Sequence, residues 1–594
     1  MARNKYDVDE ELGTPFSLEY CKRLLRYVKP YKKEMLITLI IMLLASVASL
    51  LGPYLVKVAM DTNIPNKDIK GLIGVCILFF ITIVIAAICM KYKIKTMTYV
   101  GQGVVKSIRS DLFNHLQKLP FAYYDSRPHG KILVRVVNYV NALSDLLSNG
   151  LINLLTDLFS IFVIIGFMIF ISPRLTLVCM IGMPILAIVV AMLAKVQRRT
   201  TQMYSNKQSN LNAYIQESIS GMKVTQAFAR ERINAEKFKN VSDENRRTWI
   251  NAVKYQLMLW PAIDNISVLT VSLVYLIGVR SIGESITIGT LIAFVGYIWR
   301  FWNPIVNIAN FYNTLIMAMA YLERIFETLD EEVNISNLPG AYELPPIEGD
   351  VQFKDVIFKY EDEDKEILKN VCFDVKAGET IALVGPTGAG KTTIINLLSR
   401  FYDVTSGEVL VDGNNIRNVT LDSLRKQMGV MLQDTFIFSG TILDNIRYGK
   451  LDATDEEIIR ASKAVKAHDF IINLKDGYNT QVNERGSRLS VGQRQLISFA
   501  RALLADPKIL ILDEATSSID TKTEQALQEG LDRLLKGRTS FVIAHRLSTI
   551  KNATRIMVIN DGKIVEQGTH KELMDQKGEY CELYTSQYEM VRAV

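Results

Sequence analysis

The feature that most constrains the fold of this chain is a glycine-rich segment at residues 385–392, Gly385-Pro386-Thr387-Gly388-Ala389-Gly390-Lys391-Thr392. An apolar run at 380–384 precedes it, and a helix-like run at 393–398 follows it. The order strand, G-x-x-x-x-G-K-[ST] loop, helix predicts backbone N–H groups turned inward around a polyphosphate, at a helix N-terminus that adds partial positive charge. Both flanks argue against a chance glycine-rich turn, so the segment predicts a phosphate-binding loop.

Two side chains of this loop carry its chemistry. Lys391 can reach the outer phosphates of a nucleotide, and the Thr392 hydroxyl can ligate Mg²⁺. ATP and Mg²⁺ are therefore the expected cofactors. The residues assigned to nucleotide binding in the loop and at the start of its helix are Gly385, Thr387, Gly388, Gly390, Lys391, Thr392 and Thr393.

Composition divides the chain into two unlike halves. A length of 594 residues predicts two or more domains. The first half contains several apolar runs of about 20 residues, the length of a membrane-spanning helix, whereas the second half has the pattern of a soluble α/β protein. The net charge of +6 is modest for this length and gives no argument for a nucleic-acid partner. The six cysteines are scattered without a C-x-x-C pair, which indicates neither a disulfide framework nor a zinc site.

Hydropathy predicts an all-α membrane domain with six spans and long cytoplasmic extensions. The predicted spans lie at 35–58, 72–91, 151–171, 175–195, 257–279 and 288–309. Long, charged, helix-patterned segments separate spans two and three and spans four and five. Basic residues gather in the N-terminal flank and in these two segments, which places both termini and both segments in the cytoplasm. No cleavable signal pattern precedes the first span, so we expect a multi-pass protein of the plasma membrane, in particular the bacterial inner membrane.

Two acidic residues, Asp157 and Asp264, fall within predicted spans. A charge in hydrocarbon is costly, so such residues usually face the interior of a helix bundle or a wet cavity. One interpretation is that they line a substrate path. The alternative is that each lies near a membrane interface or is neutralised by a neighbour, and the sequence leaves both open.

An acidic segment rich in proline and glycine ends the membrane half. Its composition is that of a domain linker. The predicted organisation is therefore a six-helix membrane domain at 1–330, a linker at 331–348 and an α/β ATPase domain at 349–594.

A second ATPase motif follows at 509–514, where four apolar residues precede Asp513 and Glu514. The apolar run predicts a buried strand of a parallel sheet, and ligands bind at the carboxyl ends of such strands. Asp513 is placed to hold Mg²⁺, and Glu514 to polarise the attacking water. The alternative, a strand that ends in solvated carboxylates, is disfavoured because the phosphate loop requires a metal-binding acid on a nearby strand.

A third motif, Leu489-Ser490-Val491-Gly492-Gln493, opens a strongly helical stretch and so supplies a second anion site at a helix N-terminus. Together the three motifs resemble those of the ATP-binding cassette (ABC) family, whose signature is Leu-Ser-Gly-Gly-Gln. The chain has Val491 where that family most often has glycine. The resemblance assigns Ser490, Gly492 and Gln493 to the ATP held by a partner subunit.

The resemblance covers residues 20–590 and implies further roles. In the second half, Tyr360 matches the aromatic that stacks on adenine, and Asp520 lies in a loop that crosses to the partner ATPase. Gln433 and His545 join Glu514 as catalytic residues, and Gln433 joins Thr392 and Asp513 as a metal ligand. The first half resembles the membrane domain of type IV exporters, in which residues 120–125 and 222–228 match the neighbourhoods of the coupling helices.

What the resemblance implies is ATP-driven export of small amphipathic compounds by alternating access of two half-transporters in a lipid membrane. A homodimer is favoured because every catalytic motif is intact, and a heterodimer with a degenerate partner is the alternative. Export or flipping of a lipid or lipopeptide on the same scaffold is the second hypothesis. A gated channel or a membrane-anchored regulatory ATPase is a third, and loss of transport with intact ATP binding would be its sign.

Overall fold

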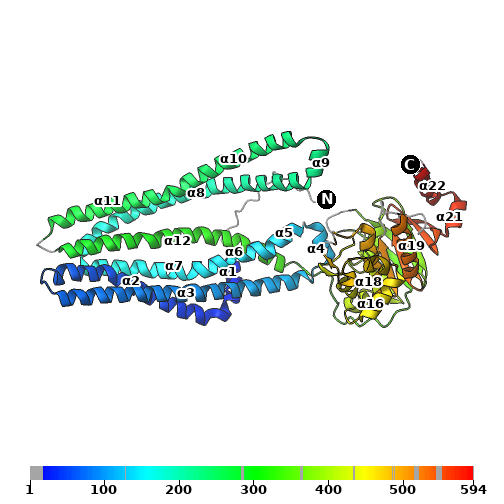
Figure 1. Cartoon of the computed structure of the whole chain (residues 1–594), viewed down its shortest axis with the longest axis horizontal. Helices are drawn as coiled ribbons and strands as arrows, with labels where there is room; N and C mark the ends of the chain where they lie inside the picture. Colours follow the sequence, from blue (N-terminus) through cyan, green and yellow to red (C-terminus); the bar gives the residue numbers. More distant parts are fainter. Residues whose placement is uncertain are drawn as a thin grey trace. The chain divides into compact units, whose positions relative to one another are not determined.

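The structure is a computed structural model that describes residues 18–127, 129–282, 286–360, 365–431, 435–483, 486, 488–513, 521–543 and 551–592. The chain forms two compact units (Figure 1). The helical unit comprises Met1–Lys118 and Ser126–Glu331, and the cassette unit comprises Leu119–Asp125 and Glu332–Val594.

The helical unit consists of long helices joined by short turns. Its helices are α1 (Leu18–Val28), α2 (Lys32–Val58), α3 (Ile69–Leu116), α5 (His129–Val134), α6 (Val140–Asp145), α7 (Leu151–Ile171), α8 (Pro173–Ser220), α9 (Met222–Ala227), α10 (Glu231–Leu257), α11 (Leu259–Arg280) and α12 (Ile288–Leu329). A 3₁₀ turn, η1 (Lys29–Tyr31), and three π-helical turns, η2 (Ala59–Asn63), η3 (Arg135–Tyr139) and η4 (Leu146–Gly150), connect some of them.

Local sequence explains where several of these helices begin. Pro173 is the first residue of α8, where its missing N–H costs nothing, and the Ser172 hydroxyl accepts a hydrogen bond from the Leu175 N–H. Thr287 caps α12 in the same way through the Thr290 N–H. Strong caps at short connections allow α7 and α8 to run antiparallel without a long loop.

Among the residues that the structure describes, five helical segments are long enough and apolar enough to cross a membrane: Glu19–Asn63, Ile69–Leu116, Leu151–Ile171, Pro173–Ser220 and Glu231–Arg280. They contain the first five predicted spans. The sixth prediction falls on α12, a helix of 42 residues whose apolar run is interrupted by Arg300, Asn303 and Asn307. The all-helical membrane domain is thus confirmed, and the number of six spans stays a prediction.

The core of the helical unit joins α2, α7, α8, α11 and α12. Phe294 and Tyr297 of α12 are completely buried in it, and the Phe167 ring of α7 stacks on Tyr297. In Figure 1 the lower parts of this core, α2, α7 and α12, run side by side, while α8 and α10 form a long hairpin that closes at α9.

The cassette unit is built on two sheets and a β-ribbon. Its strands are β1 (Val351–Phe358), β2 (Leu368–Val375), β3 (Thr380–Val384), β4 (Ser406–Val411), β5 (Asn414–Asn415), β6 (Met428–Met431), β7 (Gly440–Thr441), β8 (Gln481–Val482), β9 (Ile509–Asp513), β10 (Thr539–Ile543), β11 (Arg555–Asn560) and β12 (Lys563–Gly568). Among the described residues, the order β2-β1-β4-β5 forms the smaller sheet and β12-β11-β3-β10-β9-β6 the larger one.

Helices cover the larger sheet and complete the unit. They are α4 (Phe121–Ser126), α13 (Lys391–Leu398), α14 (Leu421–Arg425), α15 (Ile442–Arg447), α16 (Asp455–Ala464), α17 (His468–Ile472), α18 (Val491–Ala505), α19 (Thr521–Leu535), α21 (His570–Gln576) and α22 (Glu579–Arg592), with a 3₁₀ turn η5 (Gly477–Asn479). One core packs the smaller sheet and α13 against the larger sheet, and a second packs α15, α16, α18 and α19 against it.

The larger sheet is parallel from β6 to β11, with β12 antiparallel at its edge. β10 lies between β3 and β9, and its Ile543 is in register with Leu383 on one side and Asp513 on the other. The carboxyl ends of β3, β10 and β9 therefore lie at the same edge. In a parallel sheet this edge is where ligands bind.

Candidate functional site

The predicted phosphate loop connects β3 to α13. Gly390 caps α13 with a φ of 108°, and Gly385 begins the loop with a φ of 153°, a region that side chains disfavour. A Cβ on Gly385 would collide with the backbone carbonyl of Ile559 on β11. Glycine at 385 is therefore required both by the backbone angle and by the close approach of the neighbouring strand.

Lys391, the first residue of α13, folds over this loop. Its ammonium donates to the carbonyl oxygens of Gly385 and Pro386, each at 2.8 Å. Burial lowers the pKa of Lys391, while the carboxylate of Asp513 at the end of β9 acts in the opposite direction. The two predicted motifs are thus brought into electrostatic reach, because β10 alone separates the strands that carry them.

The remaining predicted residues of the loop differ in how far they are exposed to solvent. Thr387 and Gly388 are exposed, and nothing lies within 4 Å of a Cβ built on Gly388, so the mouth of the loop is open there. Thr392 is also exposed, whereas Thr393 is 5% exposed. The loop therefore has an exposed tip in front of a buried helix.

Tyr360, the predicted adenine-stacking residue, lies beside the same helix. Its hydroxyl is 3.2 Å from the Thr393 Oγ1, and its ring packs edge-on against Tyr402 with 5.2 Å between centroids. The Phe358 ring also packs edge-on against it, with 4.9 Å between centroids. Two aromatic neighbours thus hold the Tyr360 ring at the edge of the loop.

The signature segment begins α18 in the other core of the cassette. Ser490 and Gln493 form a capping box, in which the Gln493 N–H donates to the Ser490 Oγ and the Ser490 N–H donates to the Gln493 Oε1, at 3.2 and 3.0 Å. Gly492 is buried, and the Val491 side chain is 49% exposed. Among the described residues, no hydrogen bond or ion pair joins this segment to the phosphate loop of the same chain.

Four predicted site residues, Gln433, Glu514, Asp520 and His545, lie outside the described residues. The strands that lead to three of them are described: β6 ends at Met431, β9 at Asp513 and β10 at Ile543. These neighbouring strands end at the edge that carries the phosphate loop.

Sequence reasoning missed two aromatic residues at the far end of α13. Phe401 stacks on Phe121 of α4 with 4.9 Å between centroids, and the Tyr402 hydroxyl donates to the Asp125 carboxylate at 2.8 Å. Tyr402 also contacts Tyr360. By resemblance the segment 120–125 matches the neighbourhood of a coupling helix, but no pattern in the sequence links it to a residue 277 positions away.

The polar residues of the helical unit form a cluster between three helices. Asp157 of α7 is hydrogen-bonded by Asn307 of α12 and interacts with Lys93 of α3. Lys93 is 4% exposed and donates to Asn153 of α7. Lys93 is one of the basic residues that follow the second predicted span, so the sequence pattern predicts it at the membrane surface and does not predict its burial.

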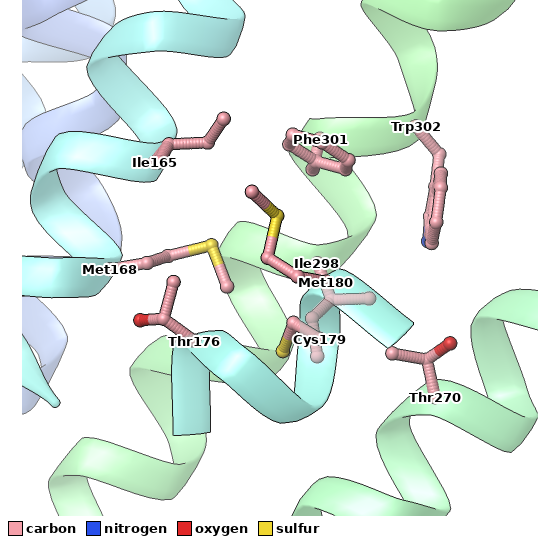
Figure 2. Close-up of a pocket in the computed structure, with 9 residues that line it drawn as sticks. All are labelled: Ile165, Met168, Thr176, Cys179, Met180, Thr270, Ile298, Phe301 and Trp302. Carbon is pink, nitrogen blue, oxygen red and sulfur yellow. The ribbon is translucent and has the colours of Figure 1, made fainter. Parts of the chain in front are cut away.

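The other candidate for the substrate path, Asp264 of α11, is exposed, and the structure places it in no cluster with Asp157 among the described contacts. A small apolar cavity does lie between α7, α8, α11 and α12 (Figure 2). It is lined by Ile165, Met168, Thr176, Cys179, Met180, Thr270, Ile298, Phe301 and Trp302. Its volume of about 10 Å³ holds roughly one water molecule, which is too small for an amphipathic substrate.

Two family models match the chain. The ABC transporter transmembrane region matches residues 35–304, and the ABC transporter domain matches residues 368–517. The first match lies in the helical unit apart from residues 119–125, and the second lies in the cassette unit.

Proteins of similar sequence cover almost the whole chain. An uncharacterised ABC transporter ATP-binding protein, YknV, of Bacillus subtilis is 44% identical over 99% of this chain and 98% of its own length. A putative multidrug export ATP-binding/permease protein, YgaD, of the same organism is 38% identical over 95% of this chain and 99% of its own. An ATP-dependent lipid A-core flippase of Syntrophus aciditrophicus is 34% identical over 96% and 95%.

Among solved structures, a bacterial Atm1-family ABC exporter with ATP bound is similar along most of its length. The TM-score is 0.77 with 27% identity, over 93% of this chain and 98% of the other. The similarity therefore includes the arrangement of helices and strands as well as the motifs.

Proposed function

Because this chain belongs to the ABC transporter family, as a type IV bacterial half-transporter, we propose that it exports amphipathic compounds across the bacterial plasma membrane by alternating access of a dimer. ATP hydrolysis by the cassette drives transport in this family, and a half-transporter works together with a second one. The observation that carries the proposal is the phosphate loop beside Asp513, in a chain whose other unit has helices that can span a membrane.

The ATP is proposed to lie between two cassettes. Lys391 and its loop hold the phosphates in one subunit, and Ser490, Gly492 and Gln493 of the other subunit close over them. Two features support this arrangement: each segment is a helix N-terminus suited to an anion, and the two are built on different cores of one cassette. Asp520 is proposed to contact the partner, and Tyr360 the adenine.

Mg²⁺ fits the donor set near the loop. The exposed Thr392 hydroxyl and the Asp513 carboxylate are hard oxygen ligands of the kind that Mg²⁺ prefers, and Gln433 is proposed as a third. When bound, Mg²⁺ would offset negative charge on the phosphates. Lys391, held over the loop mouth, is proposed to position the outer phosphates, while Gln433 and Glu514 orient and polarise the attacking water and His545 contacts the terminal phosphate.

The assignment of the membrane half follows the same reasoning. We propose six spans, with both termini and both long helical extensions in the cytoplasm, and boundaries at 330 and 348 between membrane domain, linker and cassette. The basic residues of the N-terminal flank and of the segments after spans two and four support this orientation. Asp157 is proposed to line the substrate path, since its carboxylate lies in a polar cluster between α3, α7 and α12. Asp264 is proposed for the same path on the weaker ground that it is an exposed carboxylate within a span.

Two questions concern the partner and the cargo. A homodimer is favoured because the chain carries both a phosphate loop and a signature segment, and a heterodimer is the alternative. A drug-like amphiphile and a lipid are both compatible with relatives whose names state multidrug export and lipid A-core flipping.

The purified chain alone, in lipid nanodiscs, is expected to hydrolyse ATP. The variant Glu514→Gln is expected to bind ATP as before, while its turnover falls by about a hundredfold or more, because a general base contributes about that much to the rate. A matched control is Glu408→Gln, which neutralises an exposed carboxylate on β4. Turnover near that of the wild type in Glu514→Gln would refute the role of Glu514. Inactivity of the chain alone, restored by a co-expressed relative, would favour the heterodimer.

A further inference from the structure

One side of α12 carries a stripe of polar residues. Its members are Arg300, Asn303, Asn307, Asn310 and Thr314. At 100° per residue they lie within about 80° of one another around the helix axis and extend along about 21 Å of it. The three asparagines and the threonine are exposed, and Arg300 is partly exposed. The first three members lie within the predicted sixth span, and Asn310 and Thr314 lie just beyond its proposed cytoplasmic end.

The opposite side of α12 is apolar and buried. Phe294, Ile298 and Phe301 are at most 6% exposed, and Figure 2 shows Ile298 and Phe301 facing α7 and α8 in the apolar cavity. The helix therefore turns its apolar side inward and its polar side outward. Hydrocarbon cannot satisfy amide groups, so the exposed polar side faces water, a partner or a substrate rather than lipid tails.

The surface of α3 is the contrast within the same unit. Ile73, Ile77 and Phe80 are 54%, 55% and 66% exposed there, as expected of a face that contacts lipid. The exposed face of α3 is thus suited to lipid tails, and the α12 stripe to a polar occupant.

The position of Arg300 within this stripe depends on a proline in α2. Pro53 has no N–H, so the carbonyl of Ser49, four residues earlier, loses its helical partner. Arg300 donates to that carbonyl and, at 2.9 Å, to the Ser49 hydroxyl through the same nitrogen. Tyr297 donates to the carbonyl of Leu50 at 2.9 Å. The two hydrogen bonds to Ser49 orient the Arg300 guanidinium without neutralising its charge.

The charges around the stripe leave an excess of positive charge. Asp157 is hydrogen-bonded by Asn307 and interacts with Lys93, so these two opposite charges offset each other. Within the part of the chain that the structure describes, no carboxylate forms an ion pair with Arg300, and three of its five N–H donors are not used on Ser49. A guanidinium in this setting suits a phosphate or carboxylate group.

We propose that the α12 stripe carries the polar end of an anionic amphiphile and that Arg300 binds its phosphate or carboxylate group. The asparagines offer hydrogen bonds along the way, and the apolar part of the molecule stays with the surrounding apolar surface. This inference rests on the proposed function and names the class of its cargo: a single-chain or double-chain amphiphile with an anionic head, in preference to a cationic compound.

The test uses the full chain in phosphatidylcholine nanodiscs and measures ATP hydrolysis with three probes of equal chain length: lysophosphatidylglycerol, lysophosphatidylcholine and an alkyltrimethylammonium salt. The anionic probe is expected to stimulate most. Arg300→Gln is expected to raise its half-maximal concentration by about tenfold, the effect of one lost charge-assisted hydrogen bond. Arg280→Gln, the same change at the exposed end of α11, is the matched control and is expected to leave it unchanged.

Because Arg300→Gln also removes the contact with Ser49, two further variants separate binding from folding. Arg300→Lys keeps the charge and is expected to restore part of the response, and Asn303→Val leaves the Ser49 contact intact and is expected to weaken stimulation. Equal or stronger stimulation by the cationic probe in an active protein would overturn the inference while leaving the proposed function intact. Rapid disulfide formation between Asn307→Cys subunits that persists with the probe would overturn it too, because a second copy would then cover the stripe. A wild-type chain without ATPase activity would instead overturn the proposed function.

Discussion

The two units hold an arginine in opposite ways. Arg400 of the cassette is 1% exposed, and its guanidinium meets Asp403 at 3.1 Å and the carbonyl oxygens of Ile416, Val419 and Ser336. Arg300 of the helical unit meets one serine and, among the described residues, no carboxylate. Arg400 therefore has a structural role, because its N–H donors bind groups of the chain itself. Arg300 retains N–H donors and a positive charge that can bind another molecule.

The largest expected effect is the loss of stability when Arg400 of the cassette is replaced. Arg400→Met should lower the free energy of unfolding of the cassette by about 3–5 kcal/mol, since a buried ion pair loses one partner and three carbonyls lose a donor. Arg300→Met should cost the helical unit only about 1–2 kcal/mol, the contribution of hydrogen bonds to two neutral oxygens.

Hydrogen exchange can follow both units in the full chain, with β3 and β9 as reporters of the cassette and α2 and α12 as reporters of the helical unit. Arg417→Met, which removes a more exposed partner of Asp403, is the control for the first variant. Equal losses in Arg400→Met and Arg300→Met would mean that both arginines are structural.

A smaller effect, on the stimulation of ATP hydrolysis, is expected at the contact between Tyr402 and Asp125 of α4. Tyr402→Phe removes the hydrogen bond to Asp125 and leaves the ring on Tyr360, so ATP binding and basal hydrolysis should stay near the wild-type level. The ratio of stimulated to basal hydrolysis should fall by roughly two- to tenfold, the range expected for about 0.5–1.5 kcal/mol. Tyr342→Phe, which removes a hydroxyl bonded to Asn414, is the matched control. An unchanged ratio in Tyr402→Phe would show that the Tyr402 hydroxyl has no role in coupling ATP hydrolysis to transport.

The smallest expected effect concerns the departure from the family signature. Val491 is 49% exposed at the first position of α18, beside a capping box that does not use its side chain. Val491→Gly should therefore change turnover by less than about twofold, because the side chain of an exposed first-turn residue contributes little to the helix. A several-fold rise in ATP turnover would show that the valine hinders the partner's nucleotide.

The ATPase motifs were predictable because their chemistry is local. The phosphate loop at 385–392 is identified by its own glycines, by the strand before it and by the helix after it. All three features lie within about 20 consecutive residues. Its approach to Asp513 was also predictable, since parallel strands end at a common edge. The roles of Gln433, Glu514, Asp520 and His545 stay predictions, because these residues lie outside the described part of the chain.

The membrane half was predictable in kind but less so in detail. Long apolar runs predicted helices, and α7 matches its predicted span of 151–171. The contacts between helices were not predictable, because hydropathy averages over the whole circumference of a helix. Lys93 was counted among basic residues beyond the second span, yet packing between helices buries it against Asn153.

By itself the sequence determined the two-part organisation, the phosphate loop and the order of the motifs, since each depends on spacing along the chain. Only the tertiary structure decided that Tyr402 reaches Asp125, that Pro53 draws Arg300 onto α2 and that the asparagines of α12 face outward. The physical reason is that a helix offers several faces of comparable composition, and which face is buried depends on the neighbours that pack against it.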